Sequence, residues 1–141
     1  MTKICNLPSL IRMDIKHNVV GWFEIPVVDM DRAVKFYETV FGFELSRNKL
    51  GPLDMAWFPW VDGAMGAGGS LVRLEEAYQP SPDGVIVYFT AFSGDVAVEL
   101  SRVEGAGGKV LTEKKLISEE HGYMALFLDT EGNRIALHSR T

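Results

Sequence analysis

The hydrophobic residues between positions 19 and 45 follow a strand pattern and then a helix pattern. Residues 22–27 alternate with the two-residue period of a strand that has two different faces. One face carries Phe23, Ile25 and Val27, and we expect it to pack on the following helix. The opposite face carries Trp22 and Glu24, a pair that suits one side of a pocket better than a sheet-to-helix interface.

A helix is predicted next, because apolar side chains recur at helical spacing between Ala33 and Phe41. Asp29 or Asp31 could cap its start by accepting hydrogen bonds from the free N–H groups of the first turn, and Gly42 could end it in a left-handed conformation. Three strands are expected to follow, at residues 43–50, 55–61 and 63–73. The last of them is rich in glycine, which indicates that its backbone closely approaches another element.

The same order of elements recurs in the second half, after a linker at residues 77–84 that is rich in Pro, Ser, Asp and Gly. A strand is expected at 85–92, followed by a helix. Ser93 or Asp95 could cap this helix, and Gly107 and Gly108 end it. Three more strands are expected at 109–114, 122–129 and 134–139. The two halves match at a shift of about 64 residues, which indicates an internal duplication.

The duplication predicts an α+β fold in which two tandem βαβββ modules form a curved mixed sheet around a shared cleft. We place module 1 at about residues 19–76 and module 2 at about 85–139, within a single domain spanning 18–141. Residues 1–17 lie outside the patterned region and are interpreted as an N-terminal extension.

Composition narrows the possible partners and location. The chain has 141 residues, a net charge of −5 and no run of basic residues, so we expect neither nucleic acid nor a membrane as a partner. No apolar run is long enough to span a bilayer. The single cysteine, Cys5, cannot form an internal disulfide, which favours a reducing, cytoplasmic location.

Three stretches of sequence resemble motifs of a known family. They are Phe23-Glu-Ile-Pro-Val-Val-Asp-Met-Asp-Arg-Ala-Val-Lys-Phe-Tyr-Glu-Thr-Val-Phe-Gly-Phe, Ala106-Gly-Gly-Lys-Val-Leu, and Asp129-Thr-Glu-Gly-Asn-Arg-Ile-Ala-Leu. With the duplicated βαβββ unit, they resemble the vicinal oxygen chelate superfamily of glyoxalase I, fosfomycin and bleomycin resistance proteins and extradiol dioxygenases. The resemblance covers about residues 19–139 and implies a paired-module fold and a homodimer.

The resemblance also implies where metal ligands would lie. Metal enzymes of this family take His, Glu or Gln ligands from facing strands, and counting from the motifs places these positions at Trp22, Ser70, Val87 and Ala136. Tryptophan, valine and alanine offer no lone pair to a metal ion. We therefore expect no metal at these positions and predict no cofactor.

Glu24 is the candidate catalytic residue. Because it shares strand parity with Trp22, it should point into the cleft, where a partly desolvated carboxylate could act as a general base or anchor a ligand. The competing interpretation is a scaffold carboxylate in an ion pair, or an exposed one. An aromatic lining suits a small-molecule site, and Trp60 is a further candidate for it. The predicted ligand-binding residues are Trp22, Glu24, Trp57, Phe89 and His138.

Three functions are compatible with these features. The first is a glyoxalase-like protein that binds a small organic molecule without metal and sequesters it or transforms it with Glu24. The second is a metal-dependent lyase or dioxygenase of the same superfamily that uses ligands other than those counted above. The third is a scaffold whose surface binds another protein.

Overall fold

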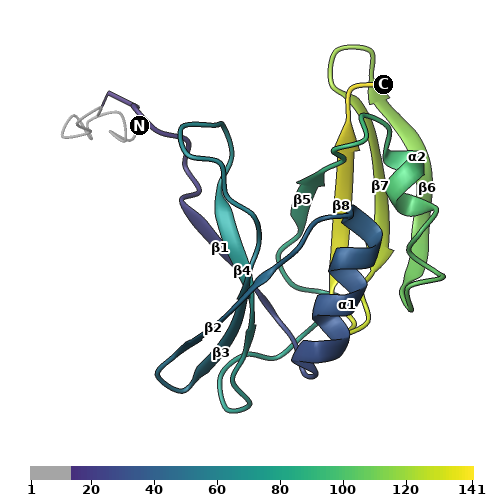
Figure 1. Cartoon of the computed structure of the whole chain (residues 1–141). Helices are drawn as coiled ribbons and strands as arrows, with labels where there is room; N and C mark the ends of the chain where they lie inside the picture. The colour runs from purple at the N-terminus through teal and green to yellow at the C-terminus, as the bar shows by residue number, and fades with distance from the viewer. Residues whose placement is uncertain (1–13) are drawn as a thin grey trace, which may run out of the picture.

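The chain forms two four-stranded sheets, one from each half of the sequence (Figure 1). This computed structural model describes residues 14–141; most of the predicted N-terminal extension, with Cys5, lies outside the described residues. The first half contains β1 (Trp22–Pro26), α1 (Met30–Phe41), β2 (Ser46–Leu50), β3 (Leu53–Trp57) and β4 (Gly68–Arg73). The second half contains β5 (Val87–Thr90), α2 (Val96–Leu100), β6 (Lys109–Ser118), β7 (Gly122–Leu128) and β8 (Arg134–Ser139).

The two halves repeat one topology, which confirms the predicted α+β fold of paired βαβββ modules. The strand order is β1-β4-β3-β2 in the first sheet and β5-β8-β7-β6 in the second. In each sheet, the first strand of the module pairs in parallel with the last, and the other pairs are antiparallel. As a result, β1 and β5 are both edge strands.

Helix α1 forms where local signals place it. Asp29 is the cap, because its side chain accepts a hydrogen bond from the backbone N–H of Arg32 at 3.1 Å. Asp31, the other candidate, instead pairs with Arg47 at 2.8 Å. Gly42 ends the helix in the left-handed region at φ 78°.

Helix α2 is shorter than the sequence predicts. Asp95 caps it by accepting a hydrogen bond from the backbone N–H of Ala97 at 2.9 Å, but the helix ends at Leu100 and does not continue to Gly107. Beyond Leu100, the N–H groups of Arg102 and Val103 bond to carbonyls three residues back, so the chain tightens into turns. Apolar spacing could not reveal this change of hydrogen-bond pattern.

The core lies between the sheets, around α1. Ile25 and Val27 are buried, as predicted for the helix-facing side of β1. Figure 1 shows α1 between the lower parts of the two diverging sheets. Its Phe41 ring lies 4.9 Å from the ring of Phe89 in β5, so the helix joins the two modules. A Cβ atom on Gly69 would lie 2.4 Å from the ring of Phe23, which explains the glycine-rich sequence of β4.

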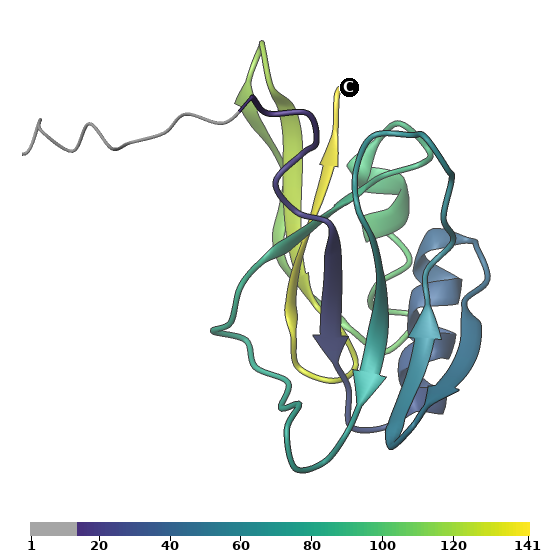
Figure 2. The ribbon, with the colours of Figure 1, turned by 90° about the vertical axis from the view of Figure 1, so that its left-hand side faces the viewer.

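The linker between β4 and β5 swings out in a wide loop before it returns to the second sheet (Figure 2). Among residues 14–141, no helix is both long enough and apolar enough to cross a membrane.

Candidate functional site

A cavity of about 660 Å³ lies between the edge strands β1 and β5. Its walls come from β1, from the linker, from the start of β5 and from the start of β8. The lining residues are Val20, Trp22, Phe23, Glu24, Ile25, Pro26, Ala67, Gln79, Ser81, Gly84, Val85, Ile86, Val87, Tyr88, Asn133, Arg134 and Ile135. Most of these side chains are apolar, and Glu24 and Arg134 are the only charged ones.

Glu24 lines this cavity and holds the linker in place. One carboxylate oxygen accepts a hydrogen bond from the hydroxyl of Tyr78 at 2.7 Å, and the other accepts one from Nε1 of Trp22 at 3.3 Å. The hydrogen bond to Glu24 raises the pKa of Tyr78, so the phenol stays protonated and continues to donate. Each oxygen of Glu24 therefore already has a donor.

Ser70 and Trp57 share the Glu24 face of the first sheet. Glu24 and Trp57 both pair with Ser70 in register, and side chains of residues in register project to the same side. Ser70 is fully buried, and its hydroxyl has no hydrogen-bond partner among the described residues. The Trp57 ring lies 5.4 Å from the Trp22 ring, edge to face, but Trp57 is not among the residues that line the cavity.

Phe89 lines a second, smaller cavity of about 260 Å³. Since it alternates with Tyr88 along β5, its ring points toward the core face, where it lies 5.8 Å from the ring of Phe23. Trp60 lines the same cavity. Phe23, Ala67, Val87 and Tyr88 line both cavities, which are therefore neighbours.

His138 is not brought to either cavity. Its Nε2 lies 2.6 Å from the carbonyl oxygen of His121, in the turn between β6 and β7. Of the five predicted ligand-binding residues, the structure thus brings Trp22 and Glu24 to the main cavity, places Phe89 at the second, and leaves Trp57 and His138 outside both. Their role in binding stays a prediction.

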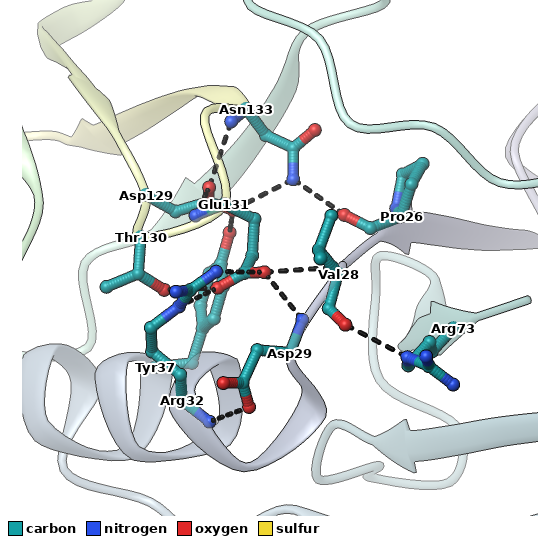
Figure 3. A network of polar contacts seen from close by, with 10 residues as sticks. All are labelled: Pro26, Val28, Asp29, Arg32, Tyr37, Arg73, Asp129, Thr130, Glu131 and Asn133. Carbon is teal, nitrogen blue, oxygen red and sulfur yellow. Dashed lines mark hydrogen bonds and ion pairs between the residues drawn. The ribbon is translucent and has the colours of Figure 1, made fainter. Parts of the chain in front are cut away.

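The turn between β7 and β8 borders the main cavity at Asn133 and carries a network of polar contacts (Figure 3). The side-chain amide of Asn133 donates to the carbonyl of Pro26 at 2.8 Å, and its oxygen accepts from the backbone N–H of Ser81 at 3.1 Å. Asn133 also donates to Asp129 at 3.0 Å. One side chain therefore joins the end of β1, the linker and β8.

Asp129 and Glu131 in the same turn have opposite pKa shifts. Burial raises the pKa of Asp129, even though it accepts hydrogen bonds from the hydroxyl of Tyr37 at 2.6 Å and from Asn133. Burial alone would also raise the pKa of Glu131. Hydrogen bonds from Arg32 and from the backbone N–H groups of Asp29 and Val28 outweigh burial and lower it to about 2.

Sequence reasoning missed Arg134 and Tyr78. Arg134 shares strand parity with Ala136, one of the counted ligand positions, and this signal could have identified it. Tyr78 lies in the linker, where no periodicity assigns a direction to a side chain. Asn133 also builds the turn itself, since its backbone N–H donates a hydrogen bond to Asp129 at 2.9 Å.

The residues present do not fit a metal ion held in the family's usual way. Ala136 pairs in register with Tyr88, so Tyr88 shares the face of Ala136 in the second sheet. Val87, the position counted from the motifs, points to the other face of that sheet. Trp22 and Ala136 offer no ligand atom. Across residues 14–141, no group of three or more His, Cys, Asp or Glu side chains is placed to hold an ion.

Comparisons with known proteins agree with this architecture. The family model described as Glyoxalase/Bleomycin resistance protein/Dioxygenase superfamily matches residues 19–137. A "Glyoxylase-like domain-containing protein" from Didymella fabae is 26% identical over 129 residues, which are 89% of this chain and 97% of the relative.

Solved structures share the fold. A glyoxalase/bleomycin resistance protein from Albidiferax ferrireducens T118 is 16% identical with a TM-score of 0.64, over 88% of this chain and all (100%) of the other. TnmS3, an antibiotic binding protein from Streptomyces sp. CB03234, is 25% identical with a TM-score of 0.60, over 92% and 100%. A glyoxalase I mutant from Zea mays is 19% identical with a TM-score of 0.63 over 85% of this chain, which spans only 46% of the maize protein.

Proposed function

Because the chain belongs to the Glyoxalase/Bleomycin resistance protein/Dioxygenase superfamily, we propose that it binds a small organic molecule in the cavity between β1 and β5, with no metal ion at the usual ligand positions. The observation that carries this proposal is the cavity itself. Its volume of about 660 Å³ falls within the roughly 300–1,000 Å³ that ligand pockets occupy.

The chemistry of the walls supports binding of a largely apolar molecule. Trp22 and Tyr88 offer aromatic surface, and the residues just before β5 contribute the aliphatic side chains of Val85 and Ile86. Few polar groups face the space, which is typical of small-molecule sites. TnmS3, which is described as an antibiotic binding protein, supports sequestration of the bound molecule as one form of this function.

A metal-independent enzyme is the second form. Glu24 borders the cavity, and its carboxylate accepts a hydrogen bond from the phenol of Tyr78 at 2.7 Å. When a ligand takes the place of Tyr78, Glu24 could accept a proton from it. Glu24→Gln keeps the shape of the side chain and removes the charge. Turnover of any substrate that continues unchanged in this variant would contradict the acid–base role.

We propose that the protein is a cytoplasmic homodimer. The support for a dimer is apolar surface on the Glu24 face of the first sheet, where Trp22 is 43%, Trp57 40% and Leu50 60% exposed. Light scattering should give twice the 15.7 kDa mass of the chain, and a monomer at micromolar concentration would contradict the dimer.

Small-molecule binding can be tested by thermal shift with a library of aromatic and alicyclic compounds. A ligand at a hundred times its dissociation constant adds about 2.7 kcal/mol of stability, which is easily measured. We expect hits, and we expect Trp22→Ala to abolish their shifts. A library without hits, or shifts that persist in Trp22→Ala, would contradict binding in this cavity.

Leu116→Ala is the control, because it removes an exposed apolar side chain from β6, away from the cavity wall. Shifts should survive in this variant. Trp57→Ala removes the ring that packs against Trp22 on the same sheet face. Loss of the shifts in Trp57→Ala but not in Trp22→Ala would place the ligand on the open face of the sheet and contradict the proposal.

A further inference from the structure

The cavity contains a cation with no partner of its own. Arg134 begins β8 and lines the cavity. Its Nε is shielded from solvent and makes no hydrogen bond, and within residues 14–141 no carboxylate forms an ion pair with its guanidinium. A shielded N–H group without an acceptor is costly, so the Arg134 side chain would be stabilised by a bound molecule that brings an acceptor to its guanidinium from the cavity.

The only acid in the same cavity does not fill this role. Glu24 bonds to Tyr78 and Trp22, at 2.7 and 3.3 Å, and not to Arg134. The other lining residues carry no charge. The cavity therefore offers one free positive group, on β8, between walls that are mostly apolar.

We propose that Arg134 binds a carboxylate of the small molecule, so that the ligand is an aromatic or alicyclic carboxylic acid. This inference rests on the proposed function, because it names the ligand class of the same cavity. A guanidinium is planar and presents two parallel N–H groups that match the two oxygens of a carboxylate. Arg134 offers one positive charge, which matches a monoanion such as a carboxylate, whereas the second charge of a phosphate dianion would have no partner and would be repelled by Glu24 in the same cavity.

The test compares acids with their neutral amides, which have nearly the same shape. The probes are benzoate, cinnamate, 2-naphthoate and indole-3-acetate, each paired with its primary amide, and binding to the full chain is measured by calorimetry. We expect the acids that bind to do so roughly ten- to a hundredfold more tightly than their amides, as befits a hydrogen bond to a charged group.

Variants assign this preference to one residue. Arg134→Met keeps an apolar stem and should reduce the affinity for the acids by the same factor, leaving the affinity for the amides within about twofold. Arg134→Lys keeps the positive charge but not the two parallel N–H groups, so an intermediate loss of affinity for the acids is expected. Arg140→Met, beyond the end of the same strand, makes the same change in net charge and should leave both affinities unchanged.

The outcomes separate the two proposals. Equal binding of acids and amides by the unmodified protein would overturn the carboxylate inference and leave small-molecule binding intact. An acid preference that survives in Arg134→Met would also overturn it. Failure of every acid and amide, together with an empty library screen, would overturn both proposals. The comparison in the unmodified protein stands even if an Arg134 variant fails to fold.

Discussion

Replacing Glu131 by glutamine should lower the free energy of unfolding by about 2 kcal/mol at neutral pH. The Glu131 carboxylate accepts hydrogen bonds from the backbone N–H groups of Val28 and Asp29, at 2.8 and 2.9 Å, and pairs with Arg32 at 2.8 Å. These N–H groups lie at the start of α1, where no turn of helix precedes them. Glutamine keeps the shape and one acceptor oxygen but removes the charge that all three donors favour.

The magnitude follows from the pKa of Glu131. A fall from the ordinary 4.5 to about 2, at about 1.36 kcal/mol for each pH unit, sets an upper limit of about 3 kcal/mol. The Glu131 side chain is fully buried, but Arg32 is 50% exposed, so water screens part of the attraction. We therefore expect about 2 kcal/mol, or a melting temperature roughly 5–8 °C lower for a domain of this size.

The effect should depend on pH with a defined sign. The pKa of Glu131 is lower in the folded chain than in the unfolded one, so its stabilisation is complete above the unfolded value of 4.5 and is lost as the pH falls toward about 2. The difference in stability between the unmodified protein and Glu131→Gln should be constant from pH 7 to 5. About half of it should remain near pH 3, roughly midway between the two pKa values.

Urea unfolding followed by tryptophan fluorescence measures both quantities. Glu119→Gln, on the exposed turn between β6 and β7, makes the same change in charge and serves as the control. If Glu131→Gln and Glu119→Gln have the same stability at pH 7, the contacts of Glu131 contribute nothing and the reasoning fails. A difference that grows on acidification would show that the sign is wrong.

Two further substitutions test a buried hydrogen bond and a close packing contact in the interior of the fold. Tyr37→Phe removes the 2.6 Å hydrogen bond to Asp129 and should cost about 1–2 kcal/mol in urea unfolding at pH 7. Burial raises the pKa of Asp129, so Asp129 is protonated in the folded protein toward pH 3, where it needs the Tyr37 donor less than a buried carboxylate does. The loss of stability caused by Tyr37→Phe should therefore be smaller near pH 3 than at pH 7. A loss that grows on acidification would contradict the raised pKa of Asp129. Gly69→Ala would place a Cβ atom 2.4 Å from the ring of Phe23 and should lower the free energy of unfolding by roughly 1–3 kcal/mol. Gly21→Ala, where a Cβ atom would meet nothing within 4 Å, is the control and should leave stability unchanged. Equal stability of the two variants would show that the Phe23 ring moves freely out of the way.

Local signals in the sequence predicted most of the fold. Alternation identified β1 and its buried side, and Gly42 marked the end of α1. The sequence left the cap of α1 open between Asp29 and Asp31, and the structure selects Asp29. The prediction was wrong where hydrogen bonding changes within an apolar pattern. Helix α2 ends at Leu100, and β3 ends at Trp57 before Pro59, although the apolar run continues to residue 61.

The site was less predictable, because contacts distant in sequence build it. Strand parity correctly directs Trp22 and Glu24 away from the helix. It cannot show that β1 lies next to the linker and to the start of β8, which places Arg134 in the same cavity. Parity along β5 also shows that Tyr88 faces the side of Ala136, once the register of β5 on β8 is known.

In the turn between β7 and β8, contacts that stabilise the fold lie beside the cavity. Read locally, residues 129–133 only reverse the chain. In the structure, Glu131 holds the start of α1 in the first module, and Asn133 holds the end of β1 and the linker at Ser81. The same turn therefore joins the two modules and borders the cavity between them. Arg134 follows Asn133 directly in the chain. The hydrogen bonds that join the two modules therefore also position the guanidinium that we propose binds the ligand's carboxylate.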